Sequence, residues 1–533
     1  MLTIRISDGL CSIKPWVSEL KKPLSFKKSV YKLPGDYRAE VKEAVQKGKN
    51  PNSVKRYEYQ VEELFSVDKD IGYFLPGALS LVREKLKELG LTWVEEDNRD
   101  PALYPEPVWQ NCSDLRNEDQ LTILASIVSA QGGIVKGCTG VGKSFIVRQL
   151  CKMFPTLNIL VVTRRASVVK QLARDIAQEL PDEVSQVGAG GRGGGTRVIV
   201  STTKSLHKIS PDAVQLLLFD EAHAVGDNDV YRELVKITHC RRFGFTATPC
   251  RSDGTKLIMQ SYFGPELVDI PYERAAEQGL VTKIKYHLME TQGPAFIDDN
   301  VSAGKVTSDL FKKRWGYWRN LQRNLLIGDA VKMSVEKNLQ VLVLVESLEH
   351  AVMLESQVLP GIPVVHYGRT SEQGFGILAN ALLDSKPITG MVLRWAQEQG
   401  RVYDKNTAEE LTRQWLYSRY RLDNKTKEAW CDQFKKGEIR AMVATMTLSE
   451  GVDFPELAVV IRGDALASRV YNEQIPGRLS RLFQGKKYGI LVDFTDRFSR
   501  FSARKALTRA HIYEDQSWEK STNLEELMNG VFA

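Results

Sequence analysis

The feature that most constrains this chain is a series of short apolar runs separated by amphipathic segments, and the series occurs twice. Strands that are covered by helices on both faces read as continuous apolar runs, so each series predicts a parallel sheet built from βαβ units. The expected fold class is therefore α/β with two tandem parallel-sheet domains. The runs are IVKG, LNILVVT, TRVIVST, VQLLLFD and RRFGFTAT between residues 113 and 281, then VLVLVES, PVVHYG, IRAMVAT, LAVVIRG and YGILVDF from residue 341 onward.

The remaining segments complete the predicted domain organisation. A chain of 533 residues is too long for one hydrophobic core. We expect an N-terminal α+β accessory domain at 1–112, a first sheet domain at 113–281, a second at 282–505 and a C-terminal tail at 506–533. Residues 2–6 are strand-like, and Leu79, Val82, Leu86 and Leu89 follow helical spacing.

Two shorter segments stand out from this pattern. Residues 370–424 have helical rather than strand-like character and predict a helical insertion in the second sheet domain. The run GAGGRGGG at 188–195 predicts a flexible connector or a loop that settles on nucleic acid, because glycine loses the most backbone entropy on ordering.

Composition narrows the cellular setting. The net charge of +7 is a mild excess that is compatible with a polyanionic partner. No stretch reaches the roughly 20 apolar residues of a membrane span, and the start of the chain lacks a secretory pattern. Seven cysteines without a CxxC pair indicate neither a zinc site nor a disulfide framework. We expect a cytoplasmic protein with no membrane contact, located in the host cytoplasm if a phage encodes it.

The strongest motif fits GxxxxGK[ST] and lies between a strand-like and a helix-like segment, which is the context that a phosphate-binding loop requires. Its glycines let backbone N–H groups face the phosphates of ATP, its lysine neutralises the β and γ oxygens, and its hydroxyl can bind Mg²⁺. A chance glycine-rich turn is the alternative. The motif residues are Gly137, Cys138, Thr139, Gly140, Val141, Gly142, Lys143 and Ser144.

An acidic pair follows the apolar run LLLF in the same domain. Asp220 and Glu221 open the sequence DEAH, at the strand edge where open α/β sheets bind ligands. Asp220 is the candidate ligand of Mg²⁺ together with Ser144, and Glu221 is the candidate general base that polarises water. Upstream, Gln120 carries an amide that can donate to and accept from the adenine edge, or simply cap a helix.

The second domain offers the segment Gln474-Ile-Pro-Gly-Arg478-Leu-Ser-Arg481. In a helix these three named side chains would share one face, which would carry two guanidinium groups beside an amide. Such a face can reach a γ-phosphate held by the other domain and act as a pair of arginine fingers. A solvated basic helix face is the alternative.

Taken in order, these segments and TRRASVVKQ at 163, STTKSL at 201, TAT at 246 and ATMTLSEGVDF at 444 resemble superfamily 2 helicases, whose motor consists of two RecA-like domains. The resemblance implies that Thr246 and Thr248, with His223 of the DEAH box, couple the ATP state to the grip on nucleic acid. It implies that Glu450, Gly451 and Asp453 line the inter-domain cleft. It also implies that residues at strand ends contact the nucleic-acid backbone, namely Thr163, Arg164, Ser201, Thr202 and Thr445, although the hydroxyls of Ser201 and Thr202 can equally serve as helix caps.

Within the superfamily, FGFTATPCRSDG and the pattern RNLLIGDAVK at 323 resemble the branch that holds phage UvsW-type helicases, XPB and restriction translocases. This resemblance implies a DNA helicase or translocase that remodels forks or Holliday-type junctions in repair or recombination, with recombination or replication proteins as possible partners. The alternatives are an RNA helicase, the motor subunit of a restriction complex, and a clamp that binds nucleotide only as a switch.

Aromatic and basic residues are interleaved in two further segments, at 311–319 and 413–421. Such residues can stack on unpaired bases while they contact phosphates. Trp415, Leu416 and Tyr420 also fit the buried face of a small helical subdomain.

Overall fold

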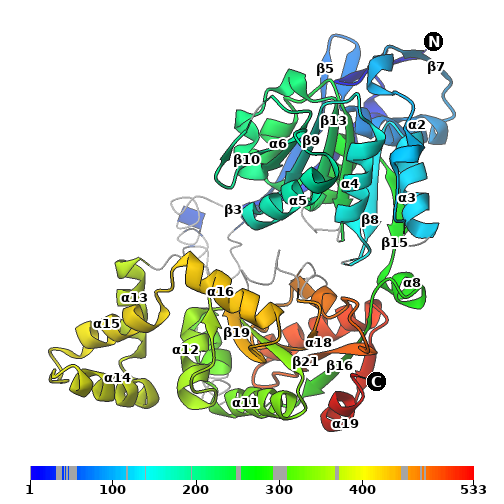
Figure 1. Cartoon of the computed structure of the whole chain (residues 1–533). Coiled ribbons are helices and arrows are strands. Elements are labelled where there is room, and N and C mark those ends of the chain that lie inside the picture. The colour runs from blue at the N-terminus through cyan, green and yellow to red at the C-terminus, as the bar shows by residue number, and fades with distance from the viewer. Residues whose placement is uncertain are drawn as a thin grey trace. The chain divides into compact units, whose positions relative to one another are not determined.

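The structure is a computed structural model, and the chain divides into two compact units (Figure 1). The first comprises Met1–Cys138 and Gly142–Ile270, and the second comprises Thr139–Val141 and Pro271–Ala533. The structure describes residues 2–31, 39–40, 43, 46, 57–115, 118–138, 140–193, 195–247, 254–291, 309–366, 371–445, 454–468, 471–472 and 476–532.

The first unit begins with a five-stranded sheet in the order β5-β6-β2-β1-β7. Helix α2 (Leu79–Glu88) packs against it through Leu79, Val82 and Leu86, at the helical spacing that the sequence shows. The predicted strand at the start of the chain and the predicted helix are both confirmed, so an α+β layer precedes the two parallel sheets. The strands are β1 (Leu2–Ile6), β2 (Cys11–Lys14), β5 (Phe65–Asp68), β6 (Ile71–Phe74) and β7 (Trp93–Asp97).

A separate two-stranded ribbon is formed by β3 (Ser25–Tyr31) and β4 (Tyr57–Glu63), which pair antiparallel. Phe26 packs against the core of the neighbouring α/β layer, and Lys28 donates to the side-chain oxygen of Asn228 at 2.8 Å. One face of the ribbon therefore packs against the α/β layer of the same unit.

The larger layer of the first unit is an eight-stranded sheet in the order β11-β10-β12-β9-β13-β14-β8-β15. All neighbours are parallel except β10 and β11 (Gly191–Arg192), as the apolar runs predict. The other strands are β8 (Gly132–Gly137), β9 (Ile159–Thr163), β10 (Val184–Gly188), β12 (Val198–Thr202), β13 (Leu216–Asp220), β14 (Arg241–Thr246) and β15 (Glu266–Ile270).

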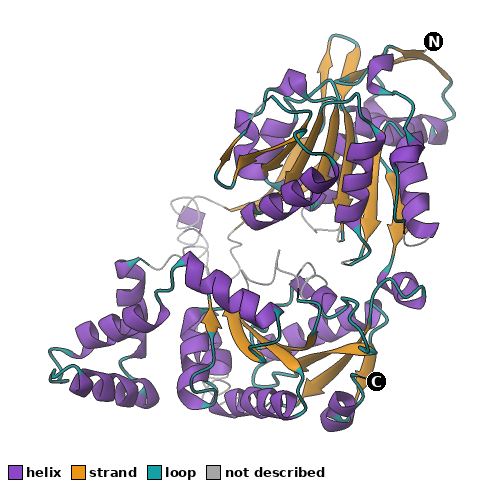
Figure 2. Cartoon of the chain, in the orientation of Figure 1, coloured by secondary structure: helices purple, strands orange, loops and turns teal. Residues whose placement is uncertain are grey.

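Helices lie alongside these strands (Figure 2) and bury the apolar side chains of the sheet. Phe219, Phe243 and Phe245 are fully buried between the layers. The helices are α3 (Glu118–Ser129), α4 (Lys143–Met153), α5 (Ala166–Glu179), α6 (Asn228–Leu234) and α7 (Thr255–Phe263).

The glycine run does not behave as a plain flexible connector within the described residues. Gly188 pairs with Gly191, so the run closes a tight hairpin between β10 and β11. The two central residues, Ala189 and Gly190, have φ of 55° and 94°. A two-residue hairpin turn whose backbone matches the strand twist needs positive φ at both central positions, and glycine meets that need cheaply. Gly194 lies outside the described residues.

The second unit contains a seven-stranded sheet in the order β18-β19-β17-β20-β21-β16-β22, and every neighbouring pair is parallel. Together the two sheets confirm the tandem RecA-like α/β class. The strands are β16 (Lys283–Met289), β17 (Gln340–Val345), β18 (Val364–Val365), β19 (Ala441–Thr445), β20 (Leu457–Arg462), β21 (Tyr488–Phe494) and β22 (Glu519–Ser521).

The helices of the second unit include two in the segment that the sequence assigns to a tail. Helix α18 extends past residue 505, and β22 pairs with β16, so this segment contributes an edge strand to the sheet. Among the described residues no helix is both long and apolar enough to cross a bilayer. The helices are α8 (Tyr272–Glu277), α10 (Asp309–Lys313), α11 (Leu321–Glu336), α12 (Leu348–Gln357), α16 (Asn424–Lys435), α18 (Arg500–Asp515) and α19 (Leu524–Asn529).

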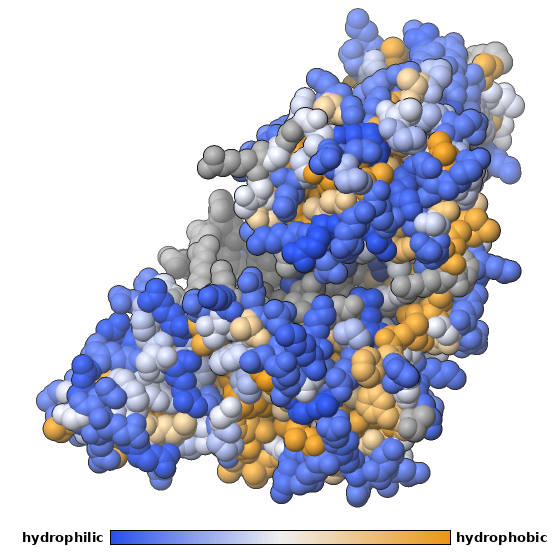
Figure 3. Space-filling model, in the orientation of Figure 1, coloured by the Kyte–Doolittle hydropathy of each residue, from blue (hydrophilic) through white to orange (hydrophobic). Residues whose placement is uncertain are grey.

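The predicted helical insertion is confirmed as α13 (Glu372–Leu382), α14 (Lys386–Glu398) and α15 (Ala408–Tyr420), which lie together in Figure 1. Trp415, Leu416 and Tyr420 are buried, so these side chains form a packed face and do not present rings to bases. The surface over these helices is mainly hydrophilic on the face shown in Figure 3. In the segment at 311–319, Tyr317 and Trp318 are likewise buried.

A fully buried charge cluster occupies the carboxyl edge of the second sheet. Arg509 donates to both oxygens of Asp493 at 2.7 and 3.0 Å and to Asp496 at 3.0 Å. Arg323 donates to Asp496 at 3.0 Å, and Arg462 binds Asp464 through two bonds of 2.7 Å. These bonds join α11 and α18 to the ends of β20 and β21, so the cluster fixes the segments that leave the sheet there.

Candidate active site

The phosphate-binding loop has the backbone that the motif requires. Gly140 and Gly142 have φ of 101° and 94°, a region that side chains with a Cβ rarely adopt. Gly142 is the N-cap of α4 and provides no side-chain cap, so the first-turn N–H groups of α4 are not occupied by a capping side chain. Backbone N–H groups at a helix start, backed by the helix dipole, form a natural site for phosphate.

Lys143 holds its ammonium group over the loop. Its Nζ donates to the carbonyl oxygen of Gly137 at 2.8 Å and to that of Cys138 at 3.1 Å. Ser144, the next residue, is exposed on the first turn of α4. Both predicted phosphate and metal ligands are therefore at the mouth of the loop, while Thr139 lies outside the described residues.

Gln120 is buried beside the loop, on the first turn of α3. A Cβ atom placed on Gly142 would lie 2.8 Å from its Nε2. The structure thus brings the predicted adenine-reading amide against the phosphate-binding loop, a contact that sequence distance alone does not reveal. Its role in reading adenine stays a prediction.

The acidic pair lies at the same edge of the sheet. Asp220 ends β13 in register with Phe245 of β14, and Thr246 of β14 is in register with Lys136 of β8. One strand therefore separates Asp220 from the strand that enters the loop. Burial, with the neighbouring Glu221, raises the pKa of Asp220 to about 7, and Lys143 opposes the rise. The opposing effect places the lysine and the aspartate in one electrostatic environment.

Glu221 adopts a left-handed backbone with φ of 57° and directs the chain into a short helical turn. Its carboxylate lies 3.3 Å from Nδ1 of His223, and that nitrogen lies 3.3 Å from Oγ1 of Thr246. A proton on Nδ1 can be donated to either oxygen. Two of the three predicted coupling residues are thus in contact, and Thr248 lies outside the described residues.

Asp220 and Ser144 are the residues that would hold an Mg²⁺ ion. A carboxylate and a hydroxyl are oxygen ligands of the kind that Mg²⁺ prefers, and the ion usually keeps several waters and bridges substrate phosphates. The pKa of Asp220 supports this fit, because a carboxylate that is costly to ionise gains from a nearby cation.

The residues expected along the nucleic-acid backbone end the next strands of the sheet. Thr163 of β9 pairs in register with Thr202 of β12, and both are buried, whereas Arg164 is exposed. Ser201 Oγ donates to the carbonyl of Thr202 at 3.2 Å, and Thr202 Oγ1 donates to Ser205 at 3.0 Å. These two hydroxyls therefore have local partners, and their contact with nucleic acid stays a prediction.

In the second unit the arginine segment is not the helix that the sequence predicts. Pro476–Arg478 form a single 3-10 turn, and the chain continues into a further turn. The α-helix predicted from Pro476 to Arg481 is therefore wrong, because Gly477 weakens helix propagation. The face that these arginines would share with Gln474 is not tested by the described residues. Arg478 is buried and Arg481 is half-buried. Gln474, Glu450, Gly451 and Asp453 lie outside the described residues, and Thr445 is buried at the end of β19.

Two residues that the sequence reading missed fix this segment. Lys486 is buried and donates to the carbonyls of Leu457 and Leu479, each at 2.7 Å. Thr282 binds the carbonyl of Ser480 through its backbone N–H at 2.7 Å and that of Arg481 through its hydroxyl at 2.9 Å. No sequence signal separates Lys486 from an exposed lysine, because its partners are backbone carbonyls supplied by the fold.

Comparisons with known proteins follow the same two regions. Residues 113–251 match the family described as Type III restriction enzyme, res subunit, and residues 385–482 match the Helicase conserved C-terminal domain. One relative is a protein of Sulfolobus islandicus filamentous virus (isolate Iceland/Hveragerdi) that is described as helicase 22. It is 22% identical over 424 residues, which span 75% of this chain and 64% of the relative. The match thus spans less than two thirds of that viral protein.

Two further comparisons cover most of the chain. The DNA 3'-5' translocase XPB2 of Sulfurisphaera tokodaii is 21% identical over 399 residues, or 73% of this chain and 83% of the relative. The crystal structure of T4 UvsW aligns with a TM-score of 0.36 and 14% identity, covering 98% of this chain and 99% of that one.

Proposed function

We propose that this chain, which belongs to helicase superfamily 2, is an ATP-dependent DNA helicase or translocase that remodels branched DNA such as forks and four-way junctions. The observation that supports this most directly is the arrangement at one sheet edge of the first unit. There the phosphate-binding lysine begins the helix that follows β8, the acidic pair stands at the end of β13, and the histidine–threonine contact reaches β14, which lies between these two strands. This arrangement suits an ATPase in which hydrolysis at the acidic pair is coupled to the neighbouring strand β14 through His223 and Thr246.

The proposed hydrolysis begins with exchange at the loop. Lys143 leaves the carbonyls of Gly137 and Cys138 and binds the β and γ phosphate oxygens, while the first-turn N–H groups of α4 hold the remaining charge. A bound Mg²⁺ would neutralise phosphate charge, held by Asp220 and Ser144. Glu221 orients the attacking water and accepts its proton.

The second unit supplies the arginines in this proposal. Arg478 and Arg481 stabilise the charge that develops on the γ-phosphate when the units close on ATP, which makes hydrolysis depend on closure. Thr282 and Lys486 keep the backbone of this segment in place, so closure delivers a preformed turn. The residues outside the described part of this unit, Gly451, Asp453 and Gln474, complete the nucleotide contacts in the same proposal.

In this proposal His223 couples ATP hydrolysis to the contact with DNA. When Glu221 gains or loses its proton, the donor preference of Nδ1 shifts between Glu221 and Thr246. Thr246 ends β14, and in this proposal the change is passed on to the contacts that Thr163 and Arg164 make with DNA. Alternating affinity of the units for the DNA backbone then yields steps.

DNA is the proposed substrate because one relative is named a DNA translocase and the chain carries net positive charge. ATPase assays with single-stranded DNA, duplexes, forks, four-way junctions and RNA of matched length provide the test. We expect the strongest stimulation by branched DNA and ATP-dependent conversion of its strands. Stimulation by RNA alone would contradict the DNA assignment, and activity that requires added subunits would favour a restriction motor.

A further inference from the structure

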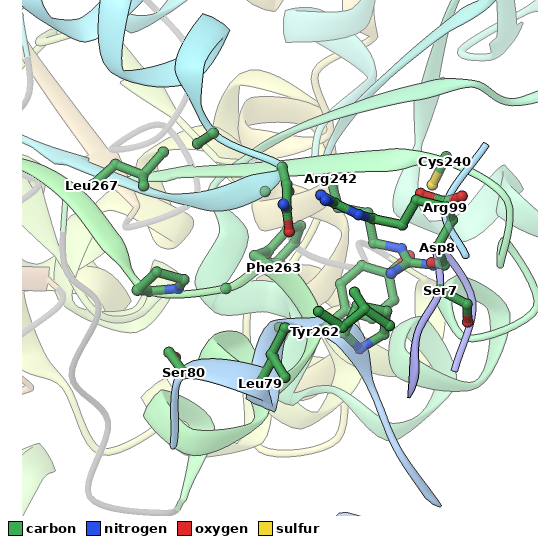
Figure 4. A pocket seen from close by; sticks show the side chains of 18 of the residues that line it. Ser7, Asp8, Leu79, Ser80, Arg99, Cys240, Arg242, Tyr262, Phe263 and Leu267 are labelled. Atoms are coloured by element: carbon green, nitrogen blue, oxygen red, sulfur yellow. The ribbon is translucent and has the colours of Figure 1, made fainter. Parts of the chain in front are cut away.

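A cavity of about 280 Å³ opens in the first unit, on the edge of the α/β sheet opposite the phosphate-binding loop (Figure 4). It lies at the starts of β8 and β14, where Gly132 and Arg242 line it. The N-terminal layer contributes the loop at Asp8 and the start of α2 at Leu79 and Ser80. A water molecule takes about 30 Å³ in the liquid, so the space admits a small molecule.

Two buried donors in the wall of the cavity, on Arg242 and Ser80, have no hydrogen-bond partner. Arg242 is only 4% exposed, and its Nε has no hydrogen-bond partner. In Figure 4 its side chain extends into the cavity, with Asp8 and Arg99 on one side and Leu79 and Ser80 below. The Nη2 atom of Arg242 is already used, because it donates to the carbonyls of Asp8, Ile237 and Thr238 at 2.7 to 3.1 Å.

The start of α2 adds one further donor, the Oγ of Ser80 on its first turn, which is buried without a partner. A 3-10 turn at Pro76–Ala78 precedes α2, and the backbone N–H of Leu79 already donates to the carbonyl of Pro76. The N-terminal dipole of this helix favours negative charge. Arg83, one turn further along, also lines the cavity.

The carboxylate in the wall already accepts hydrogen bonds. Asp8 is the one carboxylate among the lining residues; its Oδ1 accepts from the Tyr104 hydroxyl at 2.7 Å and its Oδ2 from the Asp100 N–H at 2.8 Å. Three guanidinium groups also line the cavity, those of Arg83, Arg99 and Arg242. Arg83 is paired with Glu95 at 2.6 and 2.8 Å and Arg99 with Asp97 at 2.7 Å, so two of the three charges are already balanced by carboxylates outside the lining. These guanidinium groups act on the nearby Cys11 thiol. Burial raises the pKa of this thiol to about 11, and the charges of Arg242, Arg83 and Arg99 oppose that rise.

We propose that this cavity binds a small oxyanion whose phosphate or carboxylate group accepts hydrogen bonds from Arg242. Guanidinium groups match the geometry of both anions, and unused donors in a buried wall favour an acceptor-rich ligand. Because Arg242 belongs to β14 and Ser80 to α2, the ligand would link the N-terminal layer to the motor sheet. The site is separate from the nucleotide loop and does not depend on the proposed helicase function.

The test is isothermal titration calorimetry of the full chain with inorganic phosphate and, separately, acetate at constant ionic strength. The Lys143→Ala background removes the phosphate-binding lysine, so binding at the nucleotide loop is suppressed. We expect one saturable site; binding of phosphate alone identifies a phosphate ligand, and binding of both anions identifies a general oxyanion site. Absence of saturable binding by either anion overturns the proposal.

Substitutions locate the site. Arg242→Gln in the same background is expected to weaken the binding by about ten- to hundredfold, the range of a hydrogen bond to a charged group. Since this change also removes three carbonyl contacts, Ser80→Ala and the double variant Arg83→Gln/Arg99→Gln are tested beside it and are each expected to weaken binding about threefold or more.

Arg5→Gln is the matched control, because Arg5 pairs with Glu96 on the same N-terminal sheet but does not line the cavity. We expect its affinity to equal that of the Lys143→Ala background. Equal affinity in the cavity variants and in this control overturns the proposal, whatever ATPase activity the wild-type chain shows.

Discussion

Nδ1 of His223 lies 3.3 Å from Oγ1 of Thr246, so the residue that ends the DEAH box contacts the strand that separates it from the phosphate-binding loop. If this contact couples hydrolysis to movement, Thr246→Val should keep ATPase activity within a few-fold of wild type and reduce unwinding by more than about tenfold. Loss of a hydrogen bond of about 1 kcal/mol leaves the fold intact. Parallel ATPase and strand-displacement assays measure both quantities.

Thr122→Val is the control for this substitution, because Thr122 is exposed on α3 and bonds only to its own helix. It should leave both activities unchanged. A parallel fall of ATPase and unwinding in Thr246→Val would indicate a role in the chemistry and would contradict coupling.

Glu221→Gln should abolish most hydrolysis while nucleotide binding persists. Loss of a general base costs about 10²- to 10⁴-fold in rate, and the amide retains the shape of the side chain. Lys143→Ala should instead weaken binding, because the ammonium that neutralises the phosphates is gone. Fluorescent-nucleotide titration beside steady-state ATPase assays separates the loss of hydrolysis from the loss of binding. Lys170→Ala, at an exposed position of α5, is the control. Full ATPase activity in Glu221→Gln would remove the proposed base.

Gly142→Ala should impair nucleotide binding. The position has φ of 94°, and a Cβ there would lie 2.8 Å from Nε2 of Gln120. Either the loop or the Gln120 side chain must move. Gly390→Ala offers a matched control, since that glycine lies in α14 with open space around it, and alanine should stabilise the helix by about 1 kcal/mol. Normal nucleotide affinity in Gly142→Ala would show that the loop tolerates the strain.

Asp493→Asn should lower the free energy of unfolding by about 3–5 kcal/mol, because Asp496 alone is then left to balance the buried Arg509 and Arg323. Although burial alone would raise the pKa of Asp493, Arg509, Arg462 and further hydrogen bonds hold it below its ordinary value. The stabilisation is therefore present above the unfolded-state pKa of about 3.9 and is lost as the pH falls through the lower folded-state pKa.

Denaturant unfolding of both proteins between neutral and acidic pH measures this effect. The difference between wild type and Asp493→Asn should shrink only at the acidic end. Glu290→Gln serves as the control, because its ion pair with Arg497 is exposed and contributes little. An unchanged unfolding midpoint in Asp493→Asn would contradict the assigned role of the cluster.

Lys486→Met should slow ATP turnover more than it weakens ATP binding. The substitution releases the carbonyls of Leu457 and Leu479 from their buried donor and loosens the turn that carries Arg478 and Arg481. Under the proposed scheme those arginines act on the transition state, so kcat should fall while KM changes little. Lys487→Met, at an exposed neighbouring position, is the control. Equal effects of the two changes would rule out a positioning role.

The parts of the fold that the sequence predicted well share one physical property. Strands β9, β13, β17, β20 and β21 are buried on both faces, so their apolar runs are continuous and recognisable. Strand β15 has the mixed burial of a sheet edge, and β16 alternates lysine and apolar residues, so neither forms such a run. The pairing of β22 with β16 could not be read at all, because three residues carry no periodic signal.

The candidate site likewise contains features that could be predicted from the sequence and features that could not. The loop glycines and Lys143 were predictable because local backbone chemistry demands those residue types at that spacing. The contact between Gln120 and Gly142, and the anchoring by Lys486, depend on where distant segments meet. The arginine turn was mispredicted because helical spacing was applied across Pro476 and Gly477.

The carbonyl bonds of Lys143 have a consequence for selectivity. In this state the loop solvates its own cation with the oxygens of Gly137 and Cys138, so an incoming ligand competes with the protein and does not simply fill a site. Under the proposed function, a triphosphate replaces these two bonds and also reaches the helix N–H groups, so the loop should favour ligands with several phosphate groups before any adenine contact forms.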